Sequence, residues 1–75
     1  MADRALDIRG LLCPLTWARV KGELLSMRAG ETLEVTLDHR PALPDITRNA
    51  AELGHDVLST SERDGAWVLV IERGP

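Results

Sequence analysis

Strand gives way to helix within residues 6–14, which read Leu6-Asp7-Ile8-Arg9-Gly10-Leu11-Leu12-Cys13-Pro14. Leu6 and Ile8 alternate with polar neighbours, and this period of two predicts a short strand with one apolar face. Gly10 interrupts the pattern. Pro14 suits the first position of a helix, because its missing N–H has no partner to lose there. Cys13 is therefore expected to be the N-cap of the helix that follows.

Residues 14 to about 27 show the periodicity of an amphipathic helix. Its apolar positions recur at spacings of 3, 4 and 3, at Trp17, Val20, Leu24 and Met27. The opposite side is expected to face solvent and to carry Thr16, Arg19, Glu23 and Ser26.

The rest of the chain alternates between strand and helix patterns. Residues 32–37 alternate polar and apolar side chains and predict a strand with one polar face. A helix-starting pattern at 38–44 leads into apolar positions at helical spacing, and Gly54 is expected to end that helix in a left-handed conformation. A weaker strand around 57–58, a tight turn at 62–65 and an apolar run at 67–71 predict a closing hairpin. The predicted order is β-α-β-α-β-β.

Strands with polar outer faces indicate that helices cover only one side of the sheet. Right-handed crossovers place both helices on that same side. The predicted fold is an α+β two-layer sandwich with a four-stranded mixed sheet. The last strand departs from the pattern, because Val68 and Val70 make its second face apolar too. Either this strand is central in the sheet or its second face contacts a partner.

The composition describes a small acidic protein. With 75 residues and a net charge of −3, we expect one domain spanning residues 1–75. Trp17 and Trp67 are its two aromatic residues, and the acidic balance argues against direct nucleic-acid binding. Residues 1–7 lack the features of a signal peptide, and no apolar stretch approaches the roughly 20 residues that span a bilayer. We expect a cytoplasmic protein without membrane contact.

Cys13 is the one cysteine of the chain, so an internal disulfide is excluded. The two histidines, His39 and His55, are too widely spaced to form a zinc pattern with it, and neither a metal nor a cofactor is predicted. A sulfur at a helix N-terminus faces free N–H groups and the positive end of the helix dipole, which favour the thiolate. Without a nearby histidine or a second thiol, such a thiolate can accept a group and pass it on, as a persulfide or mixed disulfide. The alternative is a buried, structural cysteine.

Several parts of the chain together form a recognisable pattern: residues 6–14, Lys21, Leu24, 30–35, Asp45-Ile46 and Gly54-His55. This pattern resembles the TusA/SirA-like family of small sulfur carrier proteins. The similarity covers nearly the whole chain, and its core is Arg-Gly-Leu-x-Cys-Pro between a strand and a helix. It implies a sulfurtransferase in which Cys13 takes a sulfane sulfur as a persulfide. It also implies a donor protein of the cysteine desulfurase or rhodanese type. The implied acceptor protein serves tRNA thiolation, molybdenum cofactor synthesis or sulfur metabolism.

Four residues are candidates to support Cys13, together with Pro14. Thr16 replaces the second proline of the family's usual Cys-Pro-x-Pro, and its regained N–H and hydroxyl become possible donors to the sulfur; alternatively it is a tolerated surface residue. Arg9, beside Gly10, either brings positive charge near the thiolate or covers the surface. Lys21 falls inside the apolar arc, about 12 Å along the helix axis from Cys13, and is expected to extend its ammonium group to water.

Three further polar residues have ordinary structural explanations. Asp45 lies in the first turn of the second helix, where a carboxylate offsets the helix dipole. His39 and His55 are expected in loops. A competing hypothesis for the whole chain is a non-catalytic regulatory or protein-interaction module, which binds partners through Val68 and Val70 and in which the cysteine is incidental.

Overall fold

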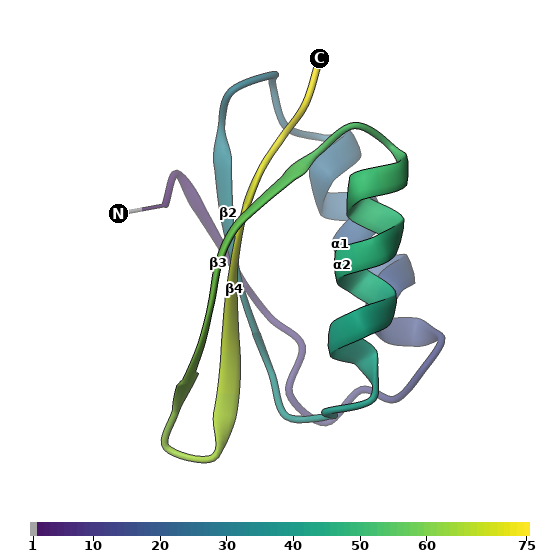
Figure 1. Ribbon diagram of the computed structural model, residues 1–75, viewed down its shortest axis with the longest axis vertical. Helices are drawn as coiled ribbons and strands as arrows, with labels where there is room; N and C mark the ends of the chain where they lie inside the picture. Colours follow the sequence, from purple (N-terminus) through teal and green to yellow (C-terminus); the bar gives the residue numbers. More distant parts are fainter. Residues whose placement is uncertain (1) are drawn as a thin grey trace.

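The computed structural model describes residues 2–75 and shows two layers, a sheet and a pair of helices (Figure 1). The elements are β1 (Arg4–Asp7), α1 (Leu15–Leu25), β2 (Thr32–Leu37), α2 (Ala42–Glu52), β3 (Asp56–Arg63) and β4 (Ala66–Glu72). Their order is the predicted one. Both helices lie on the same face of the sheet, which confirms the α+β two-layer sandwich.

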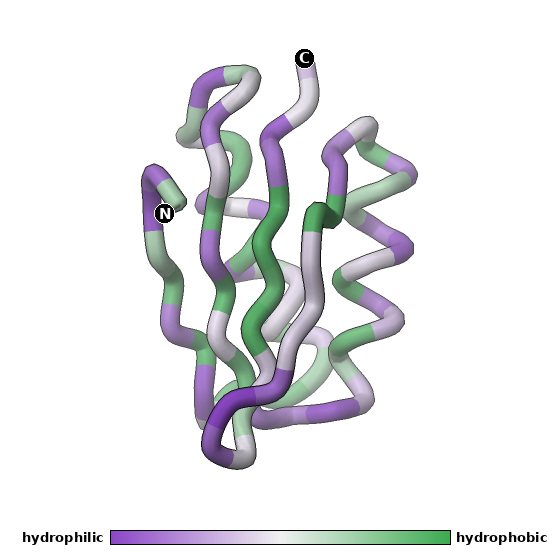
Figure 2. Tube along the Cα trace, turned by 60° about the vertical axis from the view of Figure 1, so that its left-hand side comes forward, coloured by the Kyte–Doolittle hydropathy of each residue, from purple (hydrophilic) through white to green (hydrophobic). Residues whose placement is uncertain are grey.

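The sheet is mixed and has the strand order β1-β2-β4-β3. β1 runs parallel to β2, and the other two pairings are antiparallel. β4 is therefore a central strand, which explains why both of its faces are apolar. Figure 2 shows it as the apolar strand between more polar neighbours. Val68, on the face away from the helices, is buried between Thr36 of β2 and Ser61 of β3.

The core lies between the helices and the inner face of the sheet. Leu6, Val35 and Leu69 stand in register across β1, β2 and β4, and form an apolar row under the helices. Ile46 of α2 and Val20 of α1 are fully buried in the same cluster. Each such side chain contributes roughly 1.5–3 kcal/mol by leaving water.

The buried stripe of α1 differs from the predicted one. It consists of Thr16, Val20 and Leu24, which are four residues apart and therefore stack on one side of the helix. Thr16 is only 1% exposed, so its predicted place on the solvent side is wrong. Trp17 instead packs at the margin of the core, half-buried, and Lys21 is exposed rather than within the apolar face. Burying Thr16 costs little, because its hydroxyl has a hydrogen-bond partner in the Cys13 sulfur.

The closing hairpin is longer than its sequence suggests. β3 pairs with β4 from Asp56 to Arg63, with a register shift between Val57 and Ser59 that interrupts the ladder. The strands are joined at Asp64 and Gly65, whose φ angles of 54° and 80° are those of a type I′ turn. Polar residues on both faces of β3 hide it from a search for alternation.

The segment that follows β4 forms hydrogen bonds at the C-terminal ends of both helices. The Arg73 guanidinium donates to the carbonyl of Leu24, 3.1 Å away, at the end of α1. The Gly74 N–H donates to Nδ1 of His55 at 2.9 Å, just after α2. His55 is buried, and this burial, followed by the charge of Arg73, lowers the pKa of its imidazole below the ordinary 6.5. His55 is thus a structural residue between α2 and β3.

We expect the free energy of unfolding to decrease as the pH falls below about 6.5. The folded pKa of His55 lies below the unfolded value, so the unfolded state binds its proton first, and protonation also removes the acceptor for Gly74. Urea midpoints measured at about pH 7.5 and about pH 5.5 test this. His55→Asn keeps an acceptor without titrating and should lose part of the pH dependence, whereas His39→Asn should retain it. Equal pH dependence in both variants would contradict the assignment.

Gly22 lies in the interior of α1 and has no packing reason to be glycine. A Cβ added there meets nothing within 4 Å. Gly22→Ala is therefore expected to raise the free energy of unfolding by about 0.5–1 kcal/mol, measured by urea denaturation. Gly54→Ala is the matched control with the opposite sign, because Gly54 ends α2 with φ of 90°. A loss of stability in Gly22→Ala would refute this prediction.

Candidate functional site

Cys13 lies in the loop between β1 and α1, and its side chain is exposed. The loop is anchored to β2 on its strand side. Ile8 N–H donates to the carbonyl of Thr36 at 2.8 Å, and Gly10 N–H donates to the Asp38 carboxylate at 2.9 Å. Gly10 thus takes part in positioning the segment that leads to Cys13.

The helix begins one residue later than predicted. α1 starts at Leu15, and Pro14, joined to Cys13 by a cis peptide bond, is the residue that precedes it. Leu15 N–H donates to the carbonyl of Leu12 at 2.9 Å, so a turn of residues 12–15 leads into the helix. Cys13 is therefore not the N-cap, and Pro14 is not the first helical residue. Within residues 2–75, the N-terminus of α1 has no capping hydrogen bond from a side chain.

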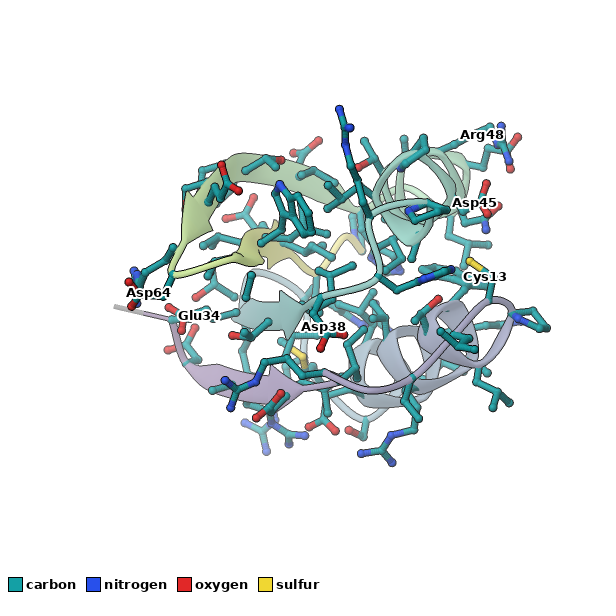
Figure 3. All side chains as sticks on the ribbon, turned by 90° about the horizontal axis from the view of Figure 1, so that it is seen from below. Cys13, Glu34, Asp38, Asp45, Arg48 and Asp64 are labelled. Atoms are coloured by element: carbon teal, nitrogen blue, oxygen red, sulfur yellow. The ribbon has the colours of Figure 1, made fainter. Side chains whose placement is uncertain are left out.

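Two oxygen-bearing side chains contact the sulfur instead. The Thr16 hydroxyl donates to Sγ of Cys13 from 3.9 Å, and the thiol faces Oδ2 of Asp45, also at 3.9 Å. Asp45 comes from the first turn of α2, and its Oδ1 accepts from Arg48 at 2.9 Å. Figure 3 shows Cys13 beside Asp45, with Arg48 beyond it. The site thus combines the start of both helices.

Asp45 does more than the sequence predicts for it, which is to offset the helix dipole. Its contact with Cys13 joins residues 32 positions apart, one in the loop before α1 and the other in α2, and no spacing rule predicts such a pair. The only signal in the sequence is the family resemblance, whose matching segments include Asp45.

Of the two roles predicted for Arg9, the structure shows surface coverage, and Lys21 is exposed to solvent as expected. The Arg9 guanidinium forms two hydrogen bonds with Asp7, at 3.0 and 2.7 Å, and so covers the surface beside β1. These bonds hold the pKa of Asp7 at about 2 and raise the pKa of Arg9. Lys21 is exposed on α1, two turns beyond the start of the helix.

Exposed apolar side chains flank the thiol. Leu12 is 61% exposed and Leu15 is 58% exposed, on either side of Cys13 and Pro14 in the chain. Large aliphatic side chains that gather on an exposed surface are typical of a surface that a partner covers.

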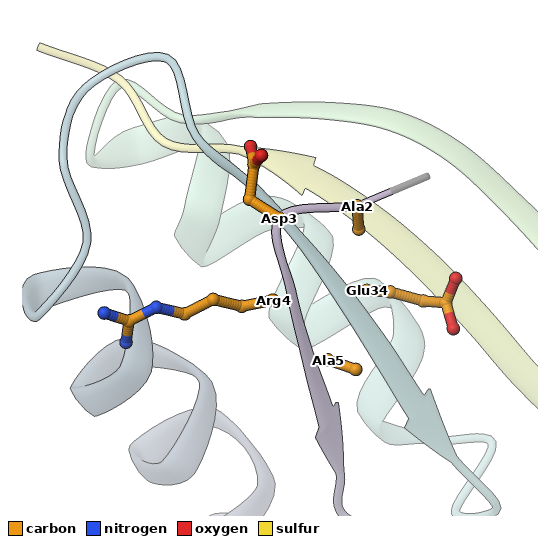
Figure 4. A pocket seen from close by; sticks show the side chains of 5 residues that line it. All are labelled: Ala2, Asp3, Arg4, Ala5 and Glu34. Atoms are coloured by element: carbon orange, nitrogen blue, oxygen red, sulfur yellow. The ribbon is translucent and has the colours of Figure 1, made fainter.

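A pocket lies away from Cys13, near the N-terminal end of the described residues. A shallow pocket of about 430 Å³ lies at the start of β1 and is lined by Ala2, Asp3, Arg4, Ala5 and Glu34 (Figure 4). Its one basic side chain, Arg4, is paired with Glu23 of α1 at 2.8 Å. Among residues 2–75, no group of three or more potential metal ligands occurs, and no helix is long and apolar enough to cross a bilayer.

Comparison with known proteins shows the family to which this chain belongs. The family model described as sulfurtransferase TusA matches residues 4–73. This chain belongs to the TusA family. A protein of Archaeoglobus fulgidus that is named as a sulfur carrier is 40% identical to it over 73 residues, covering 96% of this chain and 83% of the relative. A Neisseria meningitidis protein named in the same way is 36% identical over 72 residues, with 96% and 97% covered.

The TusA-type fold is also found among solved structures. The crystal structure of a SirA-like protein from Desulfitobacterium hafniense superimposes with a TM-score of 0.84, over 96% of this chain and 99% of that one. The two sequences are 24% identical, so this similarity concerns the fold. Family membership and the names of the relatives together indicate a sulfur carrier.

Proposed function

We propose that this protein carries sulfane sulfur as a persulfide on Cys13 and delivers it to an acceptor protein. The observation that supports this most is the position of the thiol. The one cysteine of the chain is exposed, in an anchored loop, between two exposed leucines. A structural cysteine would be buried.

The transfer step needs no external oxidant. The Cys13 sulfur attacks the terminal sulfur of a persulfide on the donor protein. A new S–S bond forms on Cys13 while the S–S bond of the donor breaks, and the donor sulfur leaves as a thiolate. The proton lost by Cys13 balances the one that the donor thiolate takes up. In the second transfer Cys13 is the donor. A thiol of the acceptor protein attacks the outer sulfur of the Cys13 persulfide, and Cys13 leaves as a thiolate.

Partner proteins supply what this small domain lacks. The thiol stands on a surface formed by a loop and two helix ends, with no histidine among its contacts in residues 2–75. A donor of the cysteine desulfurase or rhodanese type brings the persulfide, and Leu12 and Leu15 provide apolar area for docking. Such a relay belongs in a reducing compartment such as the cytoplasm.

Loading with labelled sulfur tests the proposal. The protein is incubated with a cysteine desulfurase and radiolabelled cysteine, and in parallel with a rhodanese and labelled thiosulfate. It is then separated under non-reducing conditions. We expect label on this chain with at least one donor, released by dithiothreitol. Label that stays on both donors would contradict carriage and favour the protein-interaction module instead.

A further inference from the structure

The face of α1 that points away from the sheet is apolar, whereas a helix on the surface of a protein normally presents polar residues to water. Its exposed positions at spacings of 3, 4 and 3 form what we name the outer stripe: Leu15, Ala18, Gly22 and Leu25. At about 100° per residue, this stripe lies on the side of the helix opposite to the buried Thr16, Val20 and Leu24.

The second helix shows the ordinary arrangement. The exposed positions of α2 include Thr47, Arg48 and Glu52. In α1, by contrast, two large aliphatic side chains remain in water at the two ends of an 11-residue helix, because Leu15 is 58% exposed and Leu25 is 62% exposed. The packing of residues 2–75 thus gives no reason for the apolar character of the outer stripe, and such a surface is typical of a contact with another protein.

Two positive charges border the outer stripe. Arg19 and Lys21 are exposed, and they lie about 80° to either side of the centre of the stripe around the helix axis. The ion pairs formed within residues 2–75 include neither of them. Glu23 is the one acidic residue of α1, and it is bound to Arg4 of β1. The helix therefore presents an apolar row between two positive charges that have no acidic partner in the described chain.

We propose that the sulfur donor protein docks on this face through an amphipathic helix, whose apolar side chains pack along the outer stripe and whose acidic side chains pair with Arg19 and Lys21. The inference rests on the proposed function, in taking Cys13 as the residue that the donor must reach. Leu15 belongs both to the outer stripe and to the exposed apolar surface beside Cys13, so a donor helix that lies along α1 brings its protein up to the thiol.

The shape and spacing of the outer stripe fit a helix. The row extends about 15 Å from Leu15 to Leu25, which is close to three helical turns. Ala18 and Gly22 lie between the two leucines, and a Cβ added at Gly22 meets nothing within 4 Å, so an opposing backbone can approach closely there. Apolar positions at intervals of three and four match the i, i+3, i+4 and i+7 anchors of an amphipathic helix.

The charges favour a different protein over a second copy of this chain as the occupant. Two α1 helices that cross antiparallel about a two-fold axis would bring their outer stripes together. The same axis would place Arg19 of one copy beside Arg19 of the other, and Lys21 beside Lys21, because these residues flank the apolar row. Like charges at such positions repel, whereas carboxylates on a partner helix turn both flanks into attractive contacts.

The kinetics of loading by donor proteins test the proposal. The rate of persulfide formation on Cys13 is measured against the concentration of the carrier, with a cysteine desulfurase and cysteine and with a rhodanese and thiosulfate. Lys21→Glu and Leu25→Ala should each raise the KM for the carrier several-fold and leave kcat unchanged, because they weaken docking without touching the reacting sulfur. Arg63→Glu and Leu58→Ala make the same changes at exposed positions of β3 and should behave as wild type.

Salt separates the two kinds of contact. The effect of Lys21→Glu should decrease as the ionic strength rises, because exposed charges are screened, and the effect of Leu25→Ala should persist. KM values that match those of the β3 controls would overturn the proposal. A dimer of the free protein in sedimentation equilibrium that Leu25→Ala dissociates would also overturn it, since a second copy would then cover this face.

Loading from a small molecule distinguishes docking from sulfur carriage. Inorganic polysulfide gives its terminal sulfur to the Cys13 thiolate and leaves one sulfur atom shorter, so the reaction needs no protein surface. All four variants should be loaded by polysulfide at the wild-type rate. Slower loading of Lys21→Glu or Leu25→Ala by polysulfide would show an effect on the thiol itself and contradict a docking role. A wild-type protein that polysulfide fails to load would contradict the proposed function.

Discussion

Replacing Cys13 with serine is expected to abolish loading with sulfane sulfur and to leave the fold unchanged. The substituted atom is the one proposed to form the S–S bond, and a hydroxyl cannot replace it as a persulfide carrier. Because Cys13 is exposed and in a loop, its substitution removes no core contact, and the free energy of unfolding should change by less than about 0.5 kcal/mol. Labelled sulfur retained on the chain and urea denaturation measure the two effects.

A chemical control accompanies this variant. Wild-type protein alkylated before incubation carries a blocked sulfur with every other residue intact, and it should fail to load as Cys13→Ser does. Thr16 and Asp45, the two neighbours of the sulfur, remain in place in both samples. Retention of label by either sample would show that the sulfur is carried elsewhere.

Leu69→Ala is expected to lower the free energy of unfolding by about 2–5 kcal/mol, far more than a substitution on the surface. Leu69 is fully buried in the central strand β4, opposite Val35 of β2 and Thr60 of β3. Truncation leaves a cavity in the apolar row beneath the helices. Small domains have a total stability of roughly 5–15 kcal/mol, so much of it would be lost.

The matched control is the same substitution at an exposed position. Leu58, at the irregularity of β3, is 54% exposed, and Leu58→Ala should change the free energy of unfolding by about 0.5 kcal/mol or less. Urea denaturation at constant pH compares both variants with wild type. Equal losses in the two would contradict the placement of the core between β4 and the helices.

Much of the fold follows from local patterns in the sequence. Leu33, Val35 and Leu37 alternate with polar residues because one face of β2 is covered by helices and the other is not. Gly54 and the Asp64-Gly65 pair adopt positive φ where the pattern predicts a helix end and a turn. These features depend on neighbours in the chain, which is why they can be predicted.

Features that depend on packing between elements could not be predicted in this way. Positions 16 and 17 both fit a helical stripe with Val20 and Leu24, and only the packed structure shows that Thr16 is buried and that Trp17 lies at the margin. The start of α1 depends on a turn from Leu12 to Leu15. The propensity of proline for the first helical position gives no information about that turn.

The candidate site also combines features that the sequence predicts with features that depend on packing between elements. The cysteine and its loop are visible in the sequence as a strand-to-helix junction with a family signature. Arg9 is the positively charged residue nearest to Cys13 in the sequence, but its guanidinium is paired with Asp7. Asp45 and Arg48 reach the site from the second helix, so the charge beside the sulfur is set by tertiary structure.

The persulfide assignment is tested most directly by the intact mass of the protein after incubation with a cysteine desulfurase and cysteine, or with a rhodanese and thiosulfate. We predict a gain of about 32 Da, mapped to the peptide that contains Cys13 and lost on treatment with dithiothreitol. An unchanged mass with both active donors, or added sulfur on a peptide without Cys13, would contradict it.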